Sequence, residues 1–287
     1  MISDSKIAPF PHRIVIELTP QCNLSCSMCP RHYINEINGF MPKELWMKLI
    51  DEISKASPEA IVLPFWRGES LLHPDFIELM KYALDKSLRI HISTNGHLVT
   101  GECAEILALC EFVTFSIHTP LGYSRAKEFL KLRNGSKPII QVSFIKGEKT
   151  TEKVLAEIIN TAYLGGFDSV RLYDEHTKDG VFGKSGHSLI NPRTFCPKLN
   201  DTLVIACDGK VSRCNHIWET ERGIDLNNLS IKDAWASNSL QKIRDGYPDS
   251  HCAPCDQWTG HTCGESWRIG DGKIEHKMFG PAGILND

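Results

Sequence analysis

The sequence has no apolar run that approaches the roughly 18–20 residues needed to cross a membrane. Its first residues, MISDSKIAPFPHR, lack the charged-then-apolar pattern of a secretory signal peptide. It also has little excess of one charge: the net charge of −3 gives no case for nucleic acid or an anionic membrane as a main partner. We therefore expect a cytoplasmic protein with no membrane and no nucleic-acid partner.

Cysteine, in contrast, is abundant for a protein of that compartment. The 287 residues include 11 cysteines, and an odd number argues against a complete disulfide framework. A reducing compartment favours metal ligation over disulfides. Three of the cysteines lie near the start and six lie after residue 195. This clustering favours metal sites in a chain long enough for one large domain and a small module.

The first cysteine group lies in the segment QCNLSCSMCP (21–30). Cys22, Cys26 and Cys29 have a C-x3-C-x2-C spacing on one short loop. Three thiolates this close can hold a [4Fe–4S] cluster, which takes cysteine ligands. Since a cubane has four irons, one iron is left without a protein ligand and is open to a small molecule, like the open position of a catalytic metal site. The alternatives are incidental cysteines or a zinc knuckle, although zinc usually takes four ligands in paired C-x2-4-C motifs.

This spacing, directly after a first strand, resembles the signature of the radical S-adenosylmethionine (SAM) superfamily. The resemblance implies that the amino and carboxylate groups of SAM chelate the open iron. It also implies that an electron from the cluster cleaves SAM to methionine and a 5′-deoxyadenosyl radical, which abstracts hydrogen from a substrate carbon. A flavodoxin- or ferredoxin-type protein would be the reductant. In such chemistry the cofactor reacts, and the protein supplies position and electrostatics.

Strand and helix patterns alternate through the first part of the chain, which predicts a parallel α/β sheet covered on both faces. Six strand–helix units are too few for a closed eight-stranded barrel. We therefore expect an open, partial (β/α)6 barrel, which the resemblance also implies, over 1–175. A connector over 176–194 and a small β-hairpin and helix iron–sulfur module with a tail over 195–287 follow. The expected strands are 13–19, 60–66, 88–94, 112–118, 138–145 and 169–173, and the expected helices include 43–56, one from Pro74 to Leu84, one carrying Cys103 and Cys110, and 151–164.

Polar residues follow several of the expected strands, at the end where barrels place their active sites. The segment from Arg67 to Pro74 resembles the superfamily's Gly-Gly-Glu-Pro motif, which holds the SAM amino group through a carboxylate and backbone atoms. By this resemblance Glu69, with Gly68, would have that role. The sequence departs from the motif in two places, since Arg67 replaces the first glycine and Ser70 replaces the proline.

The resemblance also assigns SAM-binding roles to residues elsewhere around the expected site. It implies that Ser93, Asn95, Ser116 and His118 contact the carboxylate or ribose of SAM, and that Met28 lies against the adenine. Serine and asparagine also end strands because they favour turns, which is the alternative explanation.

The second cysteine group has the pattern C-x12-G-x4-C, a gap, and then C-x2-C. Its cysteines are Cys196, Cys214, Cys252 and Cys255, with Gly209 in the Asp-Gly turn of a hairpin over 203–214 and a helical bridge over 229–246. Four such ligands would also suit a structural zinc. The pattern resembles the "twitch" module, a shortened SPASM domain, in which all four cysteines bind one auxiliary [4Fe–4S] cluster that passes electrons.

One further cysteine bears on the reaction. Cys263 follows Cys255 by eight residues within polar neighbours, and radical SAM epimerases return hydrogen from such a thiol. The alternative is a buried small hydrophobe, which is what we expect of Cys207, Cys103 and Cys110. Many peptide-modifying enzymes of the SPASM type carry a small leader-peptide-binding domain before the first strand. We expect no such module here, which favours a small polar substrate such as a sugar, aminocyclitol or aminoglycoside over a peptide.

We therefore expect epimerisation, with Cys263 as hydrogen donor. The first alternative is dehydrogenation of a carbinol with the auxiliary cluster as electron acceptor. Its base would come from the polar residues Asp174, Glu175, His176, Lys178 and Asp179 after the sixth strand, which could equally form a solvated loop. Epimerisation or cross-linking of a ribosomal peptide is another alternative. A non-catalytic iron–sulfur carrier or sensor is the last.

Overall fold

A single ten-stranded sheet runs through the described part of the computed structural model, which covers residues 7–34, 38–146, 150–175, 196–255, 264–270 and 273–279. The strand order is β10-β9-β6-β5-β4-β3-β2-β1-β7-β8. The strands are β1 (Arg13–Ile16), β2 (Ile61–Leu63), β3 (Arg89–Thr94), β4 (Phe112–Ser116), β5 (Ile139–Lys146), β6 (Ser169–Asp174), β7 (Thr202–Ile205), β8 (Val211–Ser212), β9 (Gly264–Gly270) and β10 (Lys273–Phe279).

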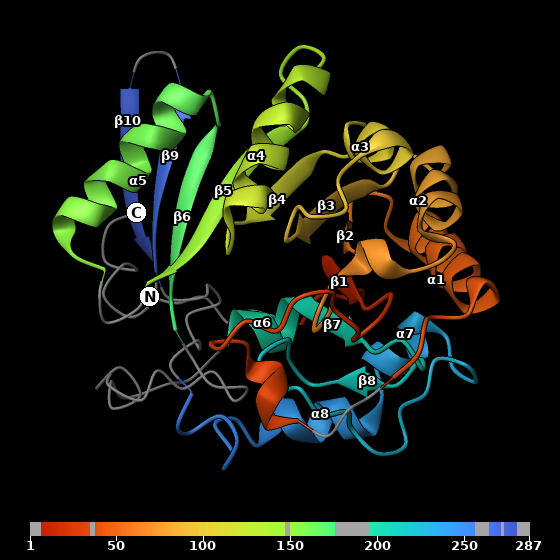
Figure 1. Cartoon of the computed structure of the whole chain (residues 1–287). Helices are drawn as coiled ribbons and strands as arrows, with labels where there is room; N and C mark the ends of the chain where they lie inside the picture. The colour runs from red at the N-terminus through yellow and green to blue at the C-terminus, as the bar shows by residue number, and fades with distance from the viewer. Residues whose placement is uncertain are drawn as a thin grey trace.

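The first six strands are parallel neighbours in chain order. Strand β2 is an apolar run, whereas apolar and polar residues alternate in β3 and β6. The helices between them form an outer arc around the strands (Figure 1). Each helix turns its apolar stripe to the sheet, as Trp46 and Leu49 do in the first. This arrangement confirms the predicted α/β fold with an unclosed parallel sheet. The helices are α1 (Lys43–Ala56), α2 (Phe76–Asp85), α3 (Gly101–Leu107), α4 (Pro120–Phe129) and α5 (Glu152–Gly165).

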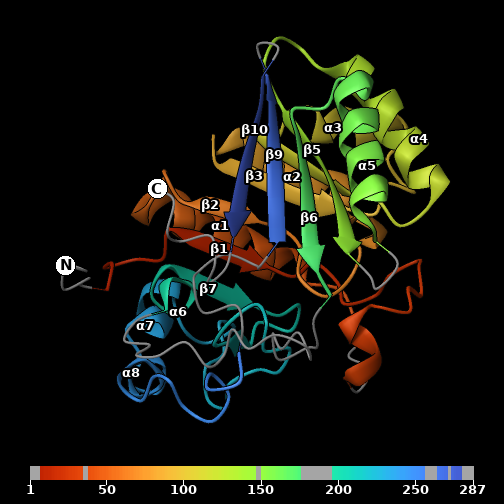
Figure 2. The same ribbon diagram turned by 90° about the vertical axis from the view of Figure 1, so that its left-hand side faces the viewer.

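The residues after 195 extend the sheet at its β1 edge. Strand β7 pairs parallel with β1, and β8 returns antiparallel through the Asp208-Gly209 turn. Gly209 has φ 87°, a conformation that favours glycine. The helices α6 (Pro197–Asp201), α7 (Ile231–Trp235) and α8 (Asn238–Asp245) lie with β7 below β1 (Figure 2). We call this part of the chain, residues 196–255, the second module.

Several elements differ from the sequence prediction. Helix α4 was not predicted, and the single helical bridge over 229–246 is two helices separated at Ala236 and Ser237. Strand β8 ends at Ser212, so Cys214 lies in the loop beyond it, and Cys110 lies just past the end of α3. At the other edge β9 pairs antiparallel with β6, and β10 pairs with β9. None of the described helices has the length and apolar character of a membrane span.

Candidate functional site

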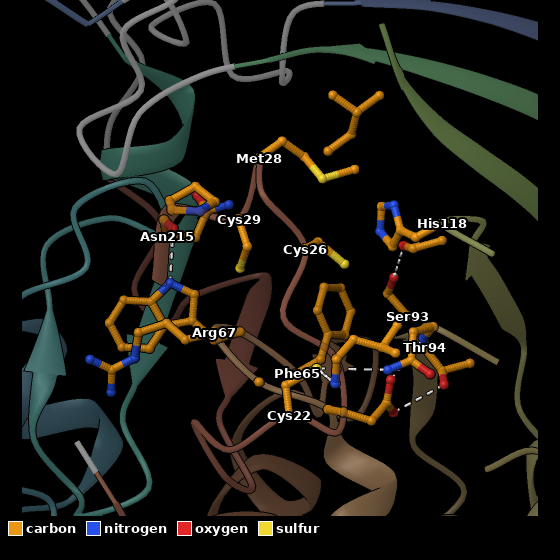
Figure 3. A pocket seen from close by; sticks show the side chains of 18 of the residues that line it. Cys22, Cys26, Met28, Cys29, Phe65, Arg67, Ser93, Thr94, His118 and Asn215 are labelled. Carbon is orange, nitrogen blue, oxygen red and sulfur yellow. Dashed lines mark hydrogen bonds between the residues drawn. The ribbon is translucent and has the colours of Figure 1, made fainter. Parts of the chain in front are cut away.

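A cavity of about 380 Å³ opens at the carboxyl ends of the six parallel strands (Figure 3). It contains every residue that the sequence placed at the first cluster and the SAM site. Those residues are Cys22, Cys26, Met28, Cys29, Gly68, Glu69, Ser93, Asn95, Ser116 and His118. The cavity thus lies at the strand ends where parallel sheets carry their sites.

Hydrogen bonds to backbone atoms fix the loop that carries the first three cysteines. The Arg31 guanidinium donates to the carbonyls of Pro20 and Leu24 at 3.4 and 3.3 Å. The Nε2 atom of His32 lies 2.8 Å from the Cys26 carbonyl oxygen. The three thiols consequently line one cavity without a disulfide.

The strand β2 end packs directly on this cysteine loop. A Cβ atom on Gly68 would lie 2.3 Å from both the Thr19 and Gln21 carbonyl oxygens, so only glycine fits there. The next residue, Glu69, donates its backbone N–H to the Gln21 oxygen at 2.7 Å. Gly68 therefore brings the Glu69 side chain and the cysteine loop to the same wall of the cavity.

Glu69 is only 3% exposed, and its carboxylate accepts three hydrogen bonds. Its donors are the Thr94 hydroxyl at 3.0 Å and the backbone N–H groups of Asn95 and Leu71 at 2.7 and 3.3 Å. Burial raises the pKa of Glu69, and the hydrogen bonds oppose that rise. No cation contacts this carboxylate within the described residues, so a ligand ammonium group would fit here.

Ser93, Ser116 and His118 line the cavity at the ends of β3 and β4. The hydroxyls of Ser93 and Ser116 lie 3.2 Å apart, and the Ser143 hydroxyl donates to Ser116 at 3.3 Å. The Nδ1 atom of His118 is buried with no hydrogen-bond partner among the described residues. Burial lowers the pKa of His118, which favours a neutral imidazole.

Asn95 lines the cavity as well, and its side chain contacts the cysteine loop. Its side-chain amide donates to Asn23 at 2.8 Å and lies 3.7 Å from the Cys22 sulfur. The amide therefore faces the cysteine loop, where N–H groups directed at cluster sulfurs influence the reduction potential.

Sequence reasoning missed the aromatic part of the cavity. Phe65, Trp66 and Tyr173 line it from the ends of β2 and β6, and Trp218 lines it from the second module. Their signal in the sequence was their position at strand ends, but aromatic residues at such positions are usually read as core.

The four later cysteines surround a second, small cavity of about 30 Å³ within the second module. The Arg213 guanidinium pairs with Glu221 at 2.5 Å and with Asp249, whose carboxylate accepts the Cys252 N–H at 3.0 Å. Burial, followed by the charge of nearby Cys214, raises the pKa of Cys196 to about 11. The predicted ligands Cys196, Cys214, Cys252 and Cys255 are thus brought together.

The number of thiols at each site suits iron–sulfur clusters. Zinc would hold all its sulfurs about 2.3 Å from a single ion, whereas a [4Fe–4S] cluster binds each thiolate to a different iron. Both cysteine sets therefore fit iron–sulfur clusters, with three ligands at the first and four at the second.

The predicted hydrogen donor and the predicted base residues lie wholly or largely outside the described residues. Cys263 lies outside the described residues, as do His176, Lys178 and Asp179. Glu175 is exposed, and only the backbone of Asp174, at the end of β6, is described.

Part of the chain is similar to a known protein. The chain is 33% identical over 96 residues to the tungsten-containing aldehyde ferredoxin oxidoreductase cofactor-modifying protein of Pyrococcus furiosus, a match that covers 33% of this chain and 27% of the relative. The matched part thus spans about a quarter of that relative's length.

Two solved structures share the fold at 15% identity. The structure of SuiB of Streptococcus suis bound to precursor peptide SuiA matches with a TM-score of 0.67. The aligned part covers 87% of this chain and 70% of the SuiB chain. The structure of BtrN in complex with AdoMet and 2-DOIA matches with a TM-score of 0.57. The aligned part covers 93% of this chain and 98% of the BtrN chain.

Two family patterns match the chain itself. The pattern of the radical SAM superfamily matches residues 16–166 of 287, and that of SPASM, an iron–sulfur cluster-binding domain, matches residues 196–256. The chain therefore belongs to the radical SAM superfamily, with a SPASM or twitch-type second module, and its cofactors are SAM and two [4Fe–4S] clusters.

Proposed function

We propose that the protein epimerises a carbon of a small polar substrate, of the sugar, aminocyclitol or aminoglycoside class. When bound at the first site, the cluster and SAM would supply a 5′-deoxyadenosyl radical that abstracts hydrogen from this carbon. The Cys263 thiol would then give a hydrogen atom to the opposite face, because its S–H bond is weaker than the C–H bond that forms. The Cys263 thiyl radical left behind would return to the thiol by taking one solvent proton and one electron, which the flavodoxin- or ferredoxin-type reductant would pass through the auxiliary cluster. The chain's own task is to hold SAM and substrate in line with this thiol.

The position of β9 is the main support for the proposal that Cys263 is the hydrogen donor. Gly264, the first residue of β9, pairs with Tyr173 of β6, and the Tyr173 side chain lines the large cavity. Cys263 is covalently bonded to Gly264, and consecutive Cα atoms are about 3.8 Å apart. The chain therefore enters β9 at the same end of the sheet that carries the cavity.

The SAM-binding roles follow from the residues around the large cavity. We assign the SAM amino group to Glu69 and the backbone at Gly68, since that carboxylate is buried and has no cation of its own among the described residues. Ser93, Ser116 and His118 face the same space and would contact the SAM carboxylate or ribose, and Met28 the adenine. Asn95 would act through the cysteine loop that it contacts.

Dehydrogenation is the second candidate, and the position of His216 favours it. His216 lines both the large cavity and the small four-cysteine cavity, so the two cofactor sites are neighbours. In this reaction the carbinol radical loses an electron to the auxiliary cluster and its hydroxyl proton to a base, giving a ketone. Modification of a ribosomal peptide is a further alternative, and the likeness to SuiB supports only the fold.

Anaerobic turnover in D2O with a candidate aminoglycoside, read by mass spectrometry, separates these reactions. The wild type, Cys263→Ala and a matched Cys103→Ala control on α3 would be compared. For epimerisation we expect a single solvent deuterium in a product of otherwise unchanged mass. That product should persist in Cys103→Ala and disappear in Cys263→Ala.

The companion measurement is 5′-deoxyadenosine release after chemical reduction. Release by both cysteine variants would show that the radical site is intact and that only hydrogen return is lost. A product lighter by two hydrogens, formed equally by Cys263→Ala, would replace epimerisation with dehydrogenation. Absence of any 5′-deoxyadenosine from the fully loaded wild type would point to an electron carrier or sensor.

A further inference from the structure

A fully buried ion pair lies where the chain departs from the superfamily motif. The side chains of Arg67 and Glu17 are both 0% exposed. The Arg67 Nε atom donates to one Glu17 oxygen at 2.7 Å, and Nη2 donates to the other at 2.6 Å. This two-point contact fixes the plane of the guanidinium as well as its position.

The same pair reaches the second module through backbone atoms. The Arg67 Nη1 atom donates to the Trp218 carbonyl oxygen at 3.1 Å. Glu17 accepts the Cys207 N–H at 3.3 Å and donates its own N–H to the Ile205 oxygen at 2.9 Å. Residues at the ends of β1 and β2 are therefore fixed to β7 and to the loop after β8.

A stacked indole adds a third connection. The Arg67 guanidinium lies 4.1 Å from the centre of the Trp66 ring. The Trp66 Nε1 atom donates to the Asn215 carbonyl oxygen at 2.8 Å (Figure 3). Asn215 directly follows Cys214, so this contact lies one residue from an auxiliary-cluster ligand.

The fixed loop, residues 214–218, lies between the two cofactor sites. Asn215, His216 and Trp218 line the large cavity, and Cys214 and His216 line the small one. On the other side, Arg67 is followed at once by Gly68 and Glu69 of the SAM site. One side chain thus joins the SAM-binding loop to the auxiliary-cluster loop.

We propose that Arg67, oriented by Glu17, is a positioning residue that sets the distance and orientation of the auxiliary cluster relative to the SAM-binding cluster. Stability alone does not call for a charged pair here, since a well-packed apolar pair of similar volume is often as stable as a buried ion pair. The charged pair adds direction, because the planar guanidinium can satisfy Glu17 and the Trp218 carbonyl only in one geometry.

Pulsed electron paramagnetic resonance of the reduced, fully loaded protein tests this proposal without any substrate. It measures the dipolar interaction between the two paramagnetic clusters, and it is independent of whether the reaction is epimerisation or dehydrogenation. In the double variant Glu17→Leu/Arg67→Met, which leaves no unpaired buried charge, we expect a changed dipolar splitting. The SAM-induced change in the first cluster's spectrum should remain.

Two further variants keep the test decisive. Arg67→Lys retains the charge but cannot reach Glu17 and Trp218 together, so it should also shift the splitting, even if the double variant fails to load its clusters. Trp46→Phe removes a buried 2.8 Å hydrogen bond to the Leu79 oxygen elsewhere in the core, and it should lower the melting temperature with an unchanged splitting. A wild-type splitting in Arg67→Lys would overturn the proposal.

Discussion

At the scale of single residues, the Glu69 carboxylate is buried and has no cationic partner among the described residues. Because burial raises its pKa, the SAM-free protein binds a proton here at higher pH than an ordinary glutamate does. A bound ammonium group favours the ionised form, so SAM binding should release that proton. Affinity for SAM is then full above the pKa of Glu69 and is lost as the pH falls through it, by up to about tenfold per pH unit.

Calorimetry of the cluster-loaded protein, in two buffers of different ionisation enthalpy, measures this proton release directly. Glu69→Gln should bind SAM roughly 10–100-fold more weakly, the typical value of a hydrogen bond to a charged group, and should lose the pH dependence. Glu78→Gln is the matched control, since Glu78 lies on α2 in an exposed pair with Lys43. A pH-independent affinity in the wild type would exclude Glu69 from SAM binding.

At the scale of elements, the contact between the end of β2 and the cysteine loop requires a bare backbone. In Gly68→Ala the new methyl group would meet the Thr19 and Gln21 carbonyl oxygens at 2.3 Å, and neither can rotate away as a side chain would. We expect a loss of more than about 3 kcal/mol in unfolding free energy, or displacement of the cysteine loop.

Denaturant unfolding and iron content of the reconstituted Gly68→Ala protein measure the two effects. Gly246→Ala is a suitable control, because its φ of −86° suits alanine and its nearest contact is one backbone oxygen at 3.2 Å. It should change stability by less than about 1 kcal/mol. Equal stability and iron content in both variants would contradict the close packing of these loops.

The elements also show how far the sequence could predict the fold. Strands β1 to β6 were predictable because their apolar residues either form a short run, as in β2, or alternate with polar ones, as in β3. Helix α4 was not, because it has only three buried residues and exposes Leu121, which leaves a weak apolar stripe. The pairing of β7 with β1 was not predictable either, since periodicity identifies a strand but not its neighbour, and the paired residues Arg13 and Thr202 are 189 positions apart.

The candidate site, like the fold, was predictable from the sequence only in part. Cysteine spacing predicted both ligand sets. The cysteines of the first set lie close in sequence and need little tertiary structure to converge, whereas those of the second set extend from Cys196 to Cys255 and were predicted from their resemblance to a known pattern. The Glu17–Arg67 pair joins residues that are 50 apart, and its contact with Trp218 spans 151. Such contacts depend on the packing of strand ends, which no local pattern encodes. The departure of Arg67 from the motif was visible in the sequence, but its partners were not.

At the scale of the whole molecule, the second module is part of the same sheet as the radical SAM site. Strand β7 pairs with β1 over four residues, from Arg13↔Thr202 to Ile16↔Ile205, and the Glu17–Arg67 pair reinforces this join. None of these contacts involves the cysteine side chains of the small cavity. The fold around the first cluster should therefore survive the loss of the auxiliary cluster.

The double variant Cys252→Ser/Cys255→Ser tests this independence. Two of its four thiolates would be lost, so iron content should fall from roughly eight to roughly four per chain. Reductive release of 5′-deoxyadenosine should stay within about twofold of the wild type, since the SAM site keeps all its residues, a change of less than roughly 0.5 kcal/mol in barrier. Product formation should be abolished, because the electron that completes the reaction has no auxiliary cluster to enter or leave.

The control for that variant is Cys207→Ala, which removes a buried thiol of the same module that does not line either cavity. It should retain both clusters and both activities. If Cys252→Ser/Cys255→Ser lost all its iron, the two sites would be folding as one unit. If instead it turned over substrate normally, the auxiliary cluster would be structural, and the electron needed in each cycle would have to come from the first cluster alone.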